Sequence, residues 1–320
     1  MICSRYAVFL AVALLPACQA DDSSSPGADS GVQDGSSLAQ ALTLQLASEK
    51  KLSKLLPPKE VDHYEASGIV ASGGMLYMAS DNLTRIAAID TSLNSGELGP
   101  GEVTNSQYEG ITVSADGRFF TIIENGSSAD GRPEVAELDA DTAFVSQSQT
   151  DAVFEHPNNA FEGVAWLSVS GKEYLLALCE NNNCNDADSP PGEGRARLLS
   201  WVDGVWITEA TLKLPKSAAF LNYSDLSLRS NGDGTYAALV VSRKSSALWL
   251  GTLSTSTWTF AGPSTFYTFP RTAQGAVQYC SVEGVTFLGP NLLAAVSDKT
   301  DDGKPCTEKA ESIHIFQMPQ

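Results

Sequence analysis

Five segments of the chain share one pattern: a small or acidic residue, usually followed by glycine, precedes an apolar run, a tight turn and a second apolar run. The segments begin at Ser67, Glu109, Glu162, Ser224 and Glu283, at intervals of 42, 53, 62 and 59 residues. Dipeptides such as Gly-Gly, Asp-Gly and Ser-Gly between the two runs indicate β-hairpins. Repeats of this length built from short strands predict a β-propeller, which is a ring of four-stranded blades.

Further apolar segments after each hairpin supply the remaining strands of the blades. Third strands are predicted at 85–90, 134–138, 197–201 and 247–253, and fourth strands at 205–208 and 258–260. The last unit has one strand after its hairpin, at 312–316, and a spare strand lies near the N-terminus at 41–46. We expect these two strands to pair, because closing the ring removes an open sheet edge. The sequence therefore predicts an all-β fold with a single five-bladed propeller over residues 40–320, and a six-bladed ring is the alternative.

One mouth of the predicted channel collects the polar residues of the repeats. The first strand of each blade lines the channel, so its leading residues converge there; these are Ser67, Glu109, Glu162, Ser224 and Glu283. The second strand runs antiparallel and returns to the same mouth. Its final residues are Asp81, Glu124, Glu180, Arg243 and Asp298.

Converging glutamates repel one another unless a cation lies among them or some of them are protonated. Carboxylate and hydroxyl oxygens are suitable ligands for a hard cation, and they favour Ca²⁺ over Mg²⁺. We therefore predict Ca²⁺ on the five leading residues, and the alternative is that these acids face bulk water. Arg243 either neutralises the acids as an ion pair, which is the preferred interpretation, or holds an anionic substrate.

The five leading residues occur in the order Ser, Glu, Glu, Ser, Glu, and each is followed by Gly or Asp and then by an apolar residue. This pattern resembles that of the SdiA-regulated family of exported bacterial β-propellers. In this ring alone it is similar to calcium-activated nucleotidases, whose five-bladed fold carries a central Ca²⁺ on Ser and Glu side chains. It also resembles the group named esterase-like activity of phytase. These resemblances imply the same Ca²⁺ site here. The fourth unit departs from the pattern with Ser224-Asp225, which leaves open which of the two faces the ion.

The N-terminus has the features of a lipoprotein export signal. One basic residue, Arg5, precedes the apolar run 6–15, which is too short to span a bilayer but fits a signal-peptide core. The sequence Leu-Pro-Ala-Cys that ends at Cys18 resembles a bacterial lipobox. We expect a signal peptide over 1–17, a lipidated Cys18 that holds the protein at a bacterial membrane, facing the periplasm or the cell surface, and a polar disordered linker over 18–39. An ordinary signal peptide is the alternative.

Four cysteines remain after the predicted targeting segment, namely Cys179, Cys184, Cys280 and Cys306. An even number in an exported domain predicts two disulfides. Three pairings exist, and we favour Cys179 with Cys184 and Cys280 with Cys306, because each pair then stays within one repeat unit. A zinc cluster is disfavoured because the spacing lacks Cys-x₂-Cys.

Charge and motifs leave two classes of function. The net charge of −18 argues against nucleic-acid binding. We find no nucleophile elbow, metalloprotease motif or phosphate-binding loop, and only His63 and His156 are placed to act as a general base at the mouth. The first class is a monomeric binding module that takes a small ligand or a protein at the mouth, with Ca²⁺ bound. The alternative is a metal-dependent hydrolase of phosphate esters or related small anions.

Overall fold

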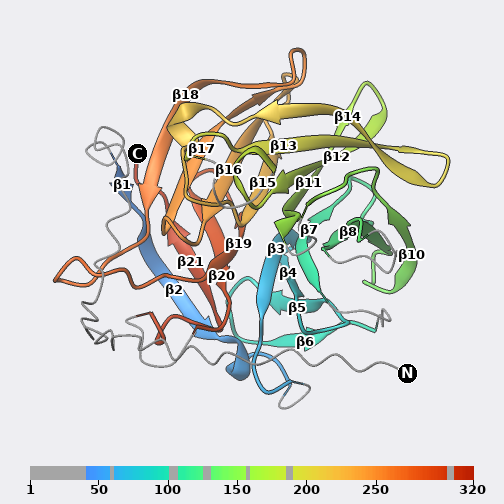
Figure 1. Ribbon diagram of the computed structural model, residues 1–320. Helices are drawn as coiled ribbons and strands as arrows, with labels where there is room; N and C mark the ends of the chain where they lie inside the picture. The colour runs from blue at the N-terminus through green and yellow to red at the C-terminus, as the bar shows by residue number, and fades with distance from the viewer. Residues whose placement is uncertain are drawn as a thin grey trace, which may run out of the picture.

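The computed structural model describes residues 41–57, 61–100, 107–124, 131–155, 159–184, 190–300 and 306–320. Five small sheets are arranged in a ring, which confirms the five-bladed propeller and makes the six-bladed alternative wrong. Figure 1 shows the first strands of the blades near the centre of the ring and the last strands at its periphery. The predicted signal peptide over 1–17, the lipidation site Cys18 and the linker to residue 39 lie outside the described residues.

The first four blades each follow the chain from the central strand outward. The first blade contains β3 (Ala66–Ser72), β4 (Met75–Ser80), β5 (Ala87–Asp90) and β6 (Gly96–Leu98). The second contains β7 (Tyr108–Val113), β8 (Phe119–Ile123), β9 (Glu134–Leu138) and β10 (Phe144–Gln149). The third contains β11 (Phe161–Val169), β12 (Lys172–Cys179), β13 (Arg195–Val202) and β14 (Val205–Lys213). The fourth contains β15 (Asp225–Ser230), β16 (Thr235–Ser242), β17 (Ala247–Ser254) and β18 (Thr259–Thr268).

The fifth blade joins the two ends of the chain. It contains β19 (Val282–Phe287), β20 (Leu292–Ser297), β21 (Ser312–Gln317) and, as its outer strand, β2 (Gln45–Lys51). β2 pairs antiparallel with β21, which confirms closure by terminal strands. The predicted strand at 41–46 is wrong in its position: β1 (Leu42–Thr43) pairs in parallel with β18 of the fourth blade. The chain crosses between blades at Leu44, whose side chain is buried in the apolar cluster between them.

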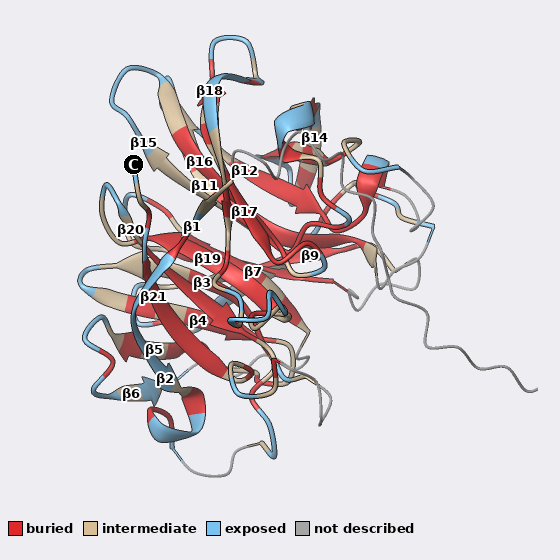
Figure 2. Cartoon of the chain, turned by 90° about the vertical axis from the view of Figure 1, so that its left-hand side faces the viewer, coloured by how far each residue is buried: buried red, intermediate tan, exposed pale blue. Residues whose placement is uncertain are grey.

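Apolar side chains fill the spaces between neighbouring blades. Strands that alternate their side chains between two faces contribute to two such clusters at once. Between the third and fourth blades, for example, Leu176 and Leu198 pack in one cluster with Val240 and Trp249. Figure 2 shows buried residues along the strands and exposed residues at many of the turns. Each fully buried large apolar side chain contributes about 1.5–3 kcal/mol to folding.

Glycine after the leading residue lets the central strands approach one another. A Cβ atom on Gly110 would lie 2.6 Å from the backbone nitrogen of Val164, on the central strand of the next blade. Added Cβ atoms on Gly68, Gly163 and Gly284 would likewise come within 3 Å of the neighbouring blade's backbone. The recurring Glu-Gly pair therefore reflects close packing at the axis as well as the chemistry of the glutamate.

Two disulfides join Cys179 to Cys184 and Cys280 to Cys306, which confirms the favoured pairing. Disulfides are typical of proteins that fold in an oxidising compartment, outside the cytosol. In the part of the chain that the structure describes, no helix has both the length and the apolar character needed to cross a membrane.

Candidate functional site

A cavity of about 200 Å³ lies at one mouth of the channel and brings together nine of the ten residues predicted there. Its lining consists of Glu65, Ser67, Asp81, Glu109, Glu124, Asn159, Glu162, Glu180, Arg243, Glu283 and Asp298. Eight of these residues are acidic and one is basic. We call this space the acidic cavity.

β-Bulges place four of the five leading residues in the acidic cavity. The pairing register between the first and second strands shifts across Ser67, Glu109, Glu162 and Glu283. A bulge leaves one residue out of the ladder and redirects its side chain. In the fourth blade β15 begins only at Asp225, which pairs with Val241, and the backbone N–H of Ser224 donates a 2.9 Å hydrogen bond to the carbonyl of the same Val241. Ser224, the leading residue of that blade, does not line the cavity.

Ser224 and Asp225 both have structural partners. The hydroxyl of Ser224 accepts a 3.1 Å hydrogen bond from the backbone N–H of Arg243. Asp225 takes the place of the axial glycine, and its Oδ2 accepts a 2.8 Å hydrogen bond from the backbone N–H of Val285 in the next blade. Its Oδ1 accepts the N–H of Leu226 at 2.7 Å. The side chain of Asp225 therefore bridges the fourth and fifth blades.

Arg243 forms the ion pair expected from the sequence. Its Nη1 lies 2.6 Å from Oε1 of Glu283, and its Nη2 lies 3.3 Å from Oε1 of Glu180. The charge of Glu283 raises the pKa of the guanidinium, which stays protonated. The single basic group that lines the acidic cavity is thus already paired with two of its acids.

Burial and mutual repulsion raise the pKa values of the acids in this cavity. Burial, followed by the charge of neighbouring carboxylates, raises the pKa of Glu109 and of Glu162 well above the usual range. Burial raises the pKa of Glu124 to about 7, and burial with the nearby charge of Glu283 raises that of Asp298 to about 7. The cluster therefore holds more negative charge than one guanidinium neutralises, and it takes up protons at a pH where isolated carboxylates would be ionised.

The acidic cavity has the donor chemistry for a hard cation without a preassembled ligand shell. Oε2 of Glu283 is buried and has no hydrogen-bond partner among the described residues. No group of three or more His, Cys, Asp or Glu side chains within those residues is arranged to hold a metal ion. Coordination would therefore require the carboxylates to rotate toward a common point.

Of the two histidines considered as bases, only His63 lies within the described residues. His63 is largely exposed, and its Nδ1 lies 3.4 Å from Glu311, outside the lining of the acidic cavity. His156 lies outside the described residues. The sequence interpretation missed two lining residues, Glu65 and Asn159. Glu65 precedes the leading residue Ser67 by two positions, and Asn159 precedes Glu162 by three. This proximity in the sequence is the one feature from which they could have been predicted.

Comparisons with known proteins agree with the fold. No protein-family model and no curated protein sequence matches the chain. The chain is similar to the crystal structure of Myxococcus xanthus glutaminyl cyclase, with a TM-score of 0.50 and 11% identity over 87% of this chain and 98% of that chain. It is also similar to the PQQ-bound aldose sugar dehydrogenase of Streptomyces coelicolor, with a TM-score of 0.46 and 12% identity over 84% of this chain and 98% of that chain. At 11% identity, the likeness to the glutaminyl cyclase supports a shared fold alone.

The fold and the site together define the class of the protein: it is a five-bladed β-propeller with an acidic cavity at one mouth of its channel. Membership of the SdiA-regulated family stays a prediction from the sequence.

Proposed function

We propose that the protein is an exported, lipid-anchored propeller that binds Ca²⁺ in the acidic cavity and acts as a binding module at this mouth. The observation that carries the proposal is the excess of acids, with eight acidic residues and one arginine around a single small cavity. Burying like charges together costs free energy, and a divalent cation offsets that cost. Ser67, Glu109, Glu162 and Glu283 are the ligands we propose, and the unpaired Oε2 of Glu283 supports this choice.

The contacts of Arg243 favour a binding module over the hydrolase of anionic esters. An enzyme of that kind needs a cationic group to orient the substrate, in addition to its metal. The guanidinium of Arg243 is committed to Glu283 and Glu180. The surrounding acids would repel an anion, whereas they attract a cation or the basic groups of a ligand.

Thermal unfolding tests the Ca²⁺ site. After treatment with EDTA, adding Ca²⁺ should raise the Tm of the full-length protein, and Mg²⁺ should raise it less. The double substitution Glu109→Gln and Glu162→Gln should abolish this rise, because it removes two carboxylate ligands. Glu97→Gln, at an exposed acid on β6, is the matched control and should keep the full rise. An unchanged Tm on adding Ca²⁺, or an equal rise in the double variant, would refute the proposal.

An activity screen separates the two classes of function. The protein should show no turnover of phosphate esters or nucleotides with Ca²⁺ or Mg²⁺ present. Turnover that is lost in the variant Arg243→Ala would instead identify a hydrolase, with Arg243 as the group that orients the anion.

A further inference from the structure

A second cavity, of about 360 Å³, lies farther along the same central strands, toward the opposite mouth of the channel. β11 illustrates the geometry: Glu162 lines the acidic cavity, and Trp166, four residues later, lines the second cavity. Four residues of strand span roughly 13 Å. The volume falls within the range of about 300–1,000 Å³ that is typical of small-molecule sites.

The second cavity differs from the acidic cavity in charge. Among the described residues that line it none is acidic, and Arg229 is the only charged one. Nη1 of Arg229 donates a 2.6 Å hydrogen bond to the backbone carbonyl of Gly289, and the guanidinium carbon lies 4.4 Å from the ring centroid of Phe287. No carboxylate among the described residues pairs with this arginine. Arg229 is therefore held at the mouth with donors left for an anionic group.

The polar groups of the aromatic lining residues are satisfied elsewhere. Nε1 of Trp166 donates a 3.2 Å hydrogen bond to Glu173, and the hydroxyl of Tyr236 donates to the carbonyl of Ser168 at 3.1 Å. The hydroxyls of Thr112 and Thr286 accept backbone N–H groups of neighbouring blades. The second cavity consequently offers a ligand apolar contacts, the guanidinium of Arg229 and the hydroxyls of Ser227 and Ser230.

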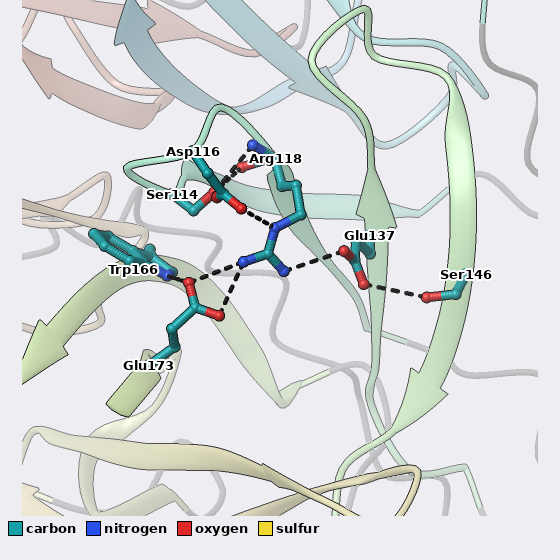
Figure 3. Close-up of polar contacts among 7 residues, drawn as sticks. All are labelled: Ser114, Asp116, Arg118, Glu137, Ser146, Trp166 and Glu173. Atoms are coloured by element: carbon teal, nitrogen blue, oxygen red, sulfur yellow. Dashed lines mark hydrogen bonds and ion pairs between the residues drawn. The ribbon is translucent and has the colours of Figure 1, made fainter. Parts of the chain in front are cut away.

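An ion-pair network holds Trp166 in this position. Figure 3 shows Arg118 between Glu173 and Glu137, with the indole nitrogen of Trp166 directed at Glu173. Arg118 Nη2 lies 2.9 Å from both carboxylate oxygens of Glu173, and its Nε lies 2.8 Å from Asp116. These charge-assisted hydrogen bonds are stronger than neutral ones, so Arg118 holds the carboxylate of Glu173 in reach of Trp166. Trp166 is thus a preorganised wall of the second cavity, which reduces the entropy lost on binding.

We propose that the second cavity binds a small aromatic or apolar carboxylic acid. The apolar body of this ligand packs against Trp166 and Tyr236, and its carboxylate pairs with Arg229. The site is separate from the acidic cavity and does not depend on the Ca²⁺ proposed there.

Isothermal titration calorimetry with 2-naphthoate, and with 2-naphthylmethanol as its neutral counterpart, tests the proposal. The full-length protein should bind 2-naphthoate saturably below about 1 mM, and the alcohol about tenfold more weakly, because the alcohol lacks the charge-assisted hydrogen bonds to Arg229. Arg229→Gln should lower the affinity for 2-naphthoate by about the same factor and leave the affinity for the alcohol unchanged. Unchanged binding of the alcohol also shows that the cavity of the variant is intact. Ser227→Leu, which narrows the cavity without removing the arginine, should weaken both compounds.

Two controls locate the binding site. Arg271→Gln, at an exposed arginine outside the second cavity, should bind both compounds as the unmodified protein does. The Glu109→Gln and Glu162→Gln double variant should do the same, whatever the fate of the Ca²⁺ site. The absence of saturable 2-naphthoate binding, or equal affinity in Arg229→Gln and the unmodified protein, would overturn the proposal.

Discussion

Nη1 of Arg243 lies 2.6 Å from Oε1 of Glu283, so that a guanidinium from the fourth blade enters the carboxylate cluster at the axis of the propeller. Glu283 is almost fully buried, whereas Arg243 is partly exposed at the rim. The arginine is the counter-charge of Glu283 and Glu180, and Lys299 pairs with Glu65 elsewhere in the lining. This arrangement determines how the protein should respond to the loss of either charge.

Arg243→Met should destabilise the protein by about 3 kcal/mol, because it leaves buried carboxylates without their counter-charge. Urea unfolding at neutral pH with EDTA present measures the change. Arg271→Gln, at an exposed arginine away from the acidic cavity, should change the free energy of unfolding by less than about 0.5 kcal/mol. An equal midpoint for Arg243→Met and the unmodified protein would show that protonation of the acids compensates fully.

The closing strand should weaken in acid through Glu49. On β2, Glu49 lies 3.3 Å from His314 and 2.6 Å from Lys309, and the hydrogen bond to His314, followed by that to Lys309, lowers the pKa of Glu49 to about 2. A carboxyl group with a lowered pKa stabilises the folded state above its unfolded value of 4.5. That contribution is lost as the pH falls from about 4.5 towards 2. Burial also lowers the pKa of His314, so its protonation destabilises the fold in the same direction.

Glu49→Gln isolates this effect. At neutral pH the variant should be less stable than the unmodified protein by about 1 kcal/mol, a value reduced by the partial exposure of Glu49. The difference should shrink as the pH falls below about 4.5, because the unmodified side chain then becomes neutral too. Unfolding curves across this pH range measure it, with Glu97→Gln as the control. A difference that stays constant with pH would contradict the assignment.

Gly110→Ala should destabilise the propeller by about 3 kcal/mol, because the new methyl group meets backbone atoms of the next blade that have little room to move. Gly289→Ala is the control, since its nearest neighbour would be a side-chain atom 3.9 Å away. The control should be neutral or slightly stabilised. Urea unfolding of both variants makes the comparison, and a small effect at Gly110 would mean that the central strands can separate.

Much of the fold could be predicted because the repeat is recognisable from local features of the sequence. Alternating apolar residues and Gly-containing turns mark each hairpin, and four cysteines within two repeat units indicate their own pairing. The closing strand was misplaced because residues 41–46 and Gln45–Lys51 are both suitable strands in isolation. Contacts with β18 and β21, distant in the chain, decide which segment pairs with which blade.

The candidate site was predicted less completely, for a physical reason. The leading residues could be named from the repeat, but the bulges that direct four of them into the cavity could not, nor could the fact that Ser224 does not line it. A bulge is a property of the register between two strands, and the local sequence does not specify it. The pairing of Arg243 with Glu180 as well as Glu283 likewise depends on how three blades meet.

The sequence by itself favoured five blades and the observed cysteine pairs, and it identified most acids at one mouth, because period, turn chemistry and residue type are local. Only the tertiary structure decided which side chains face a common space, which carboxylate keeps an unpaired oxygen, and that a second cavity with a lone arginine lies along the same channel. These features arise where the central strands of neighbouring blades converge. Their geometry is set by register and close packing between segments far apart in the chain.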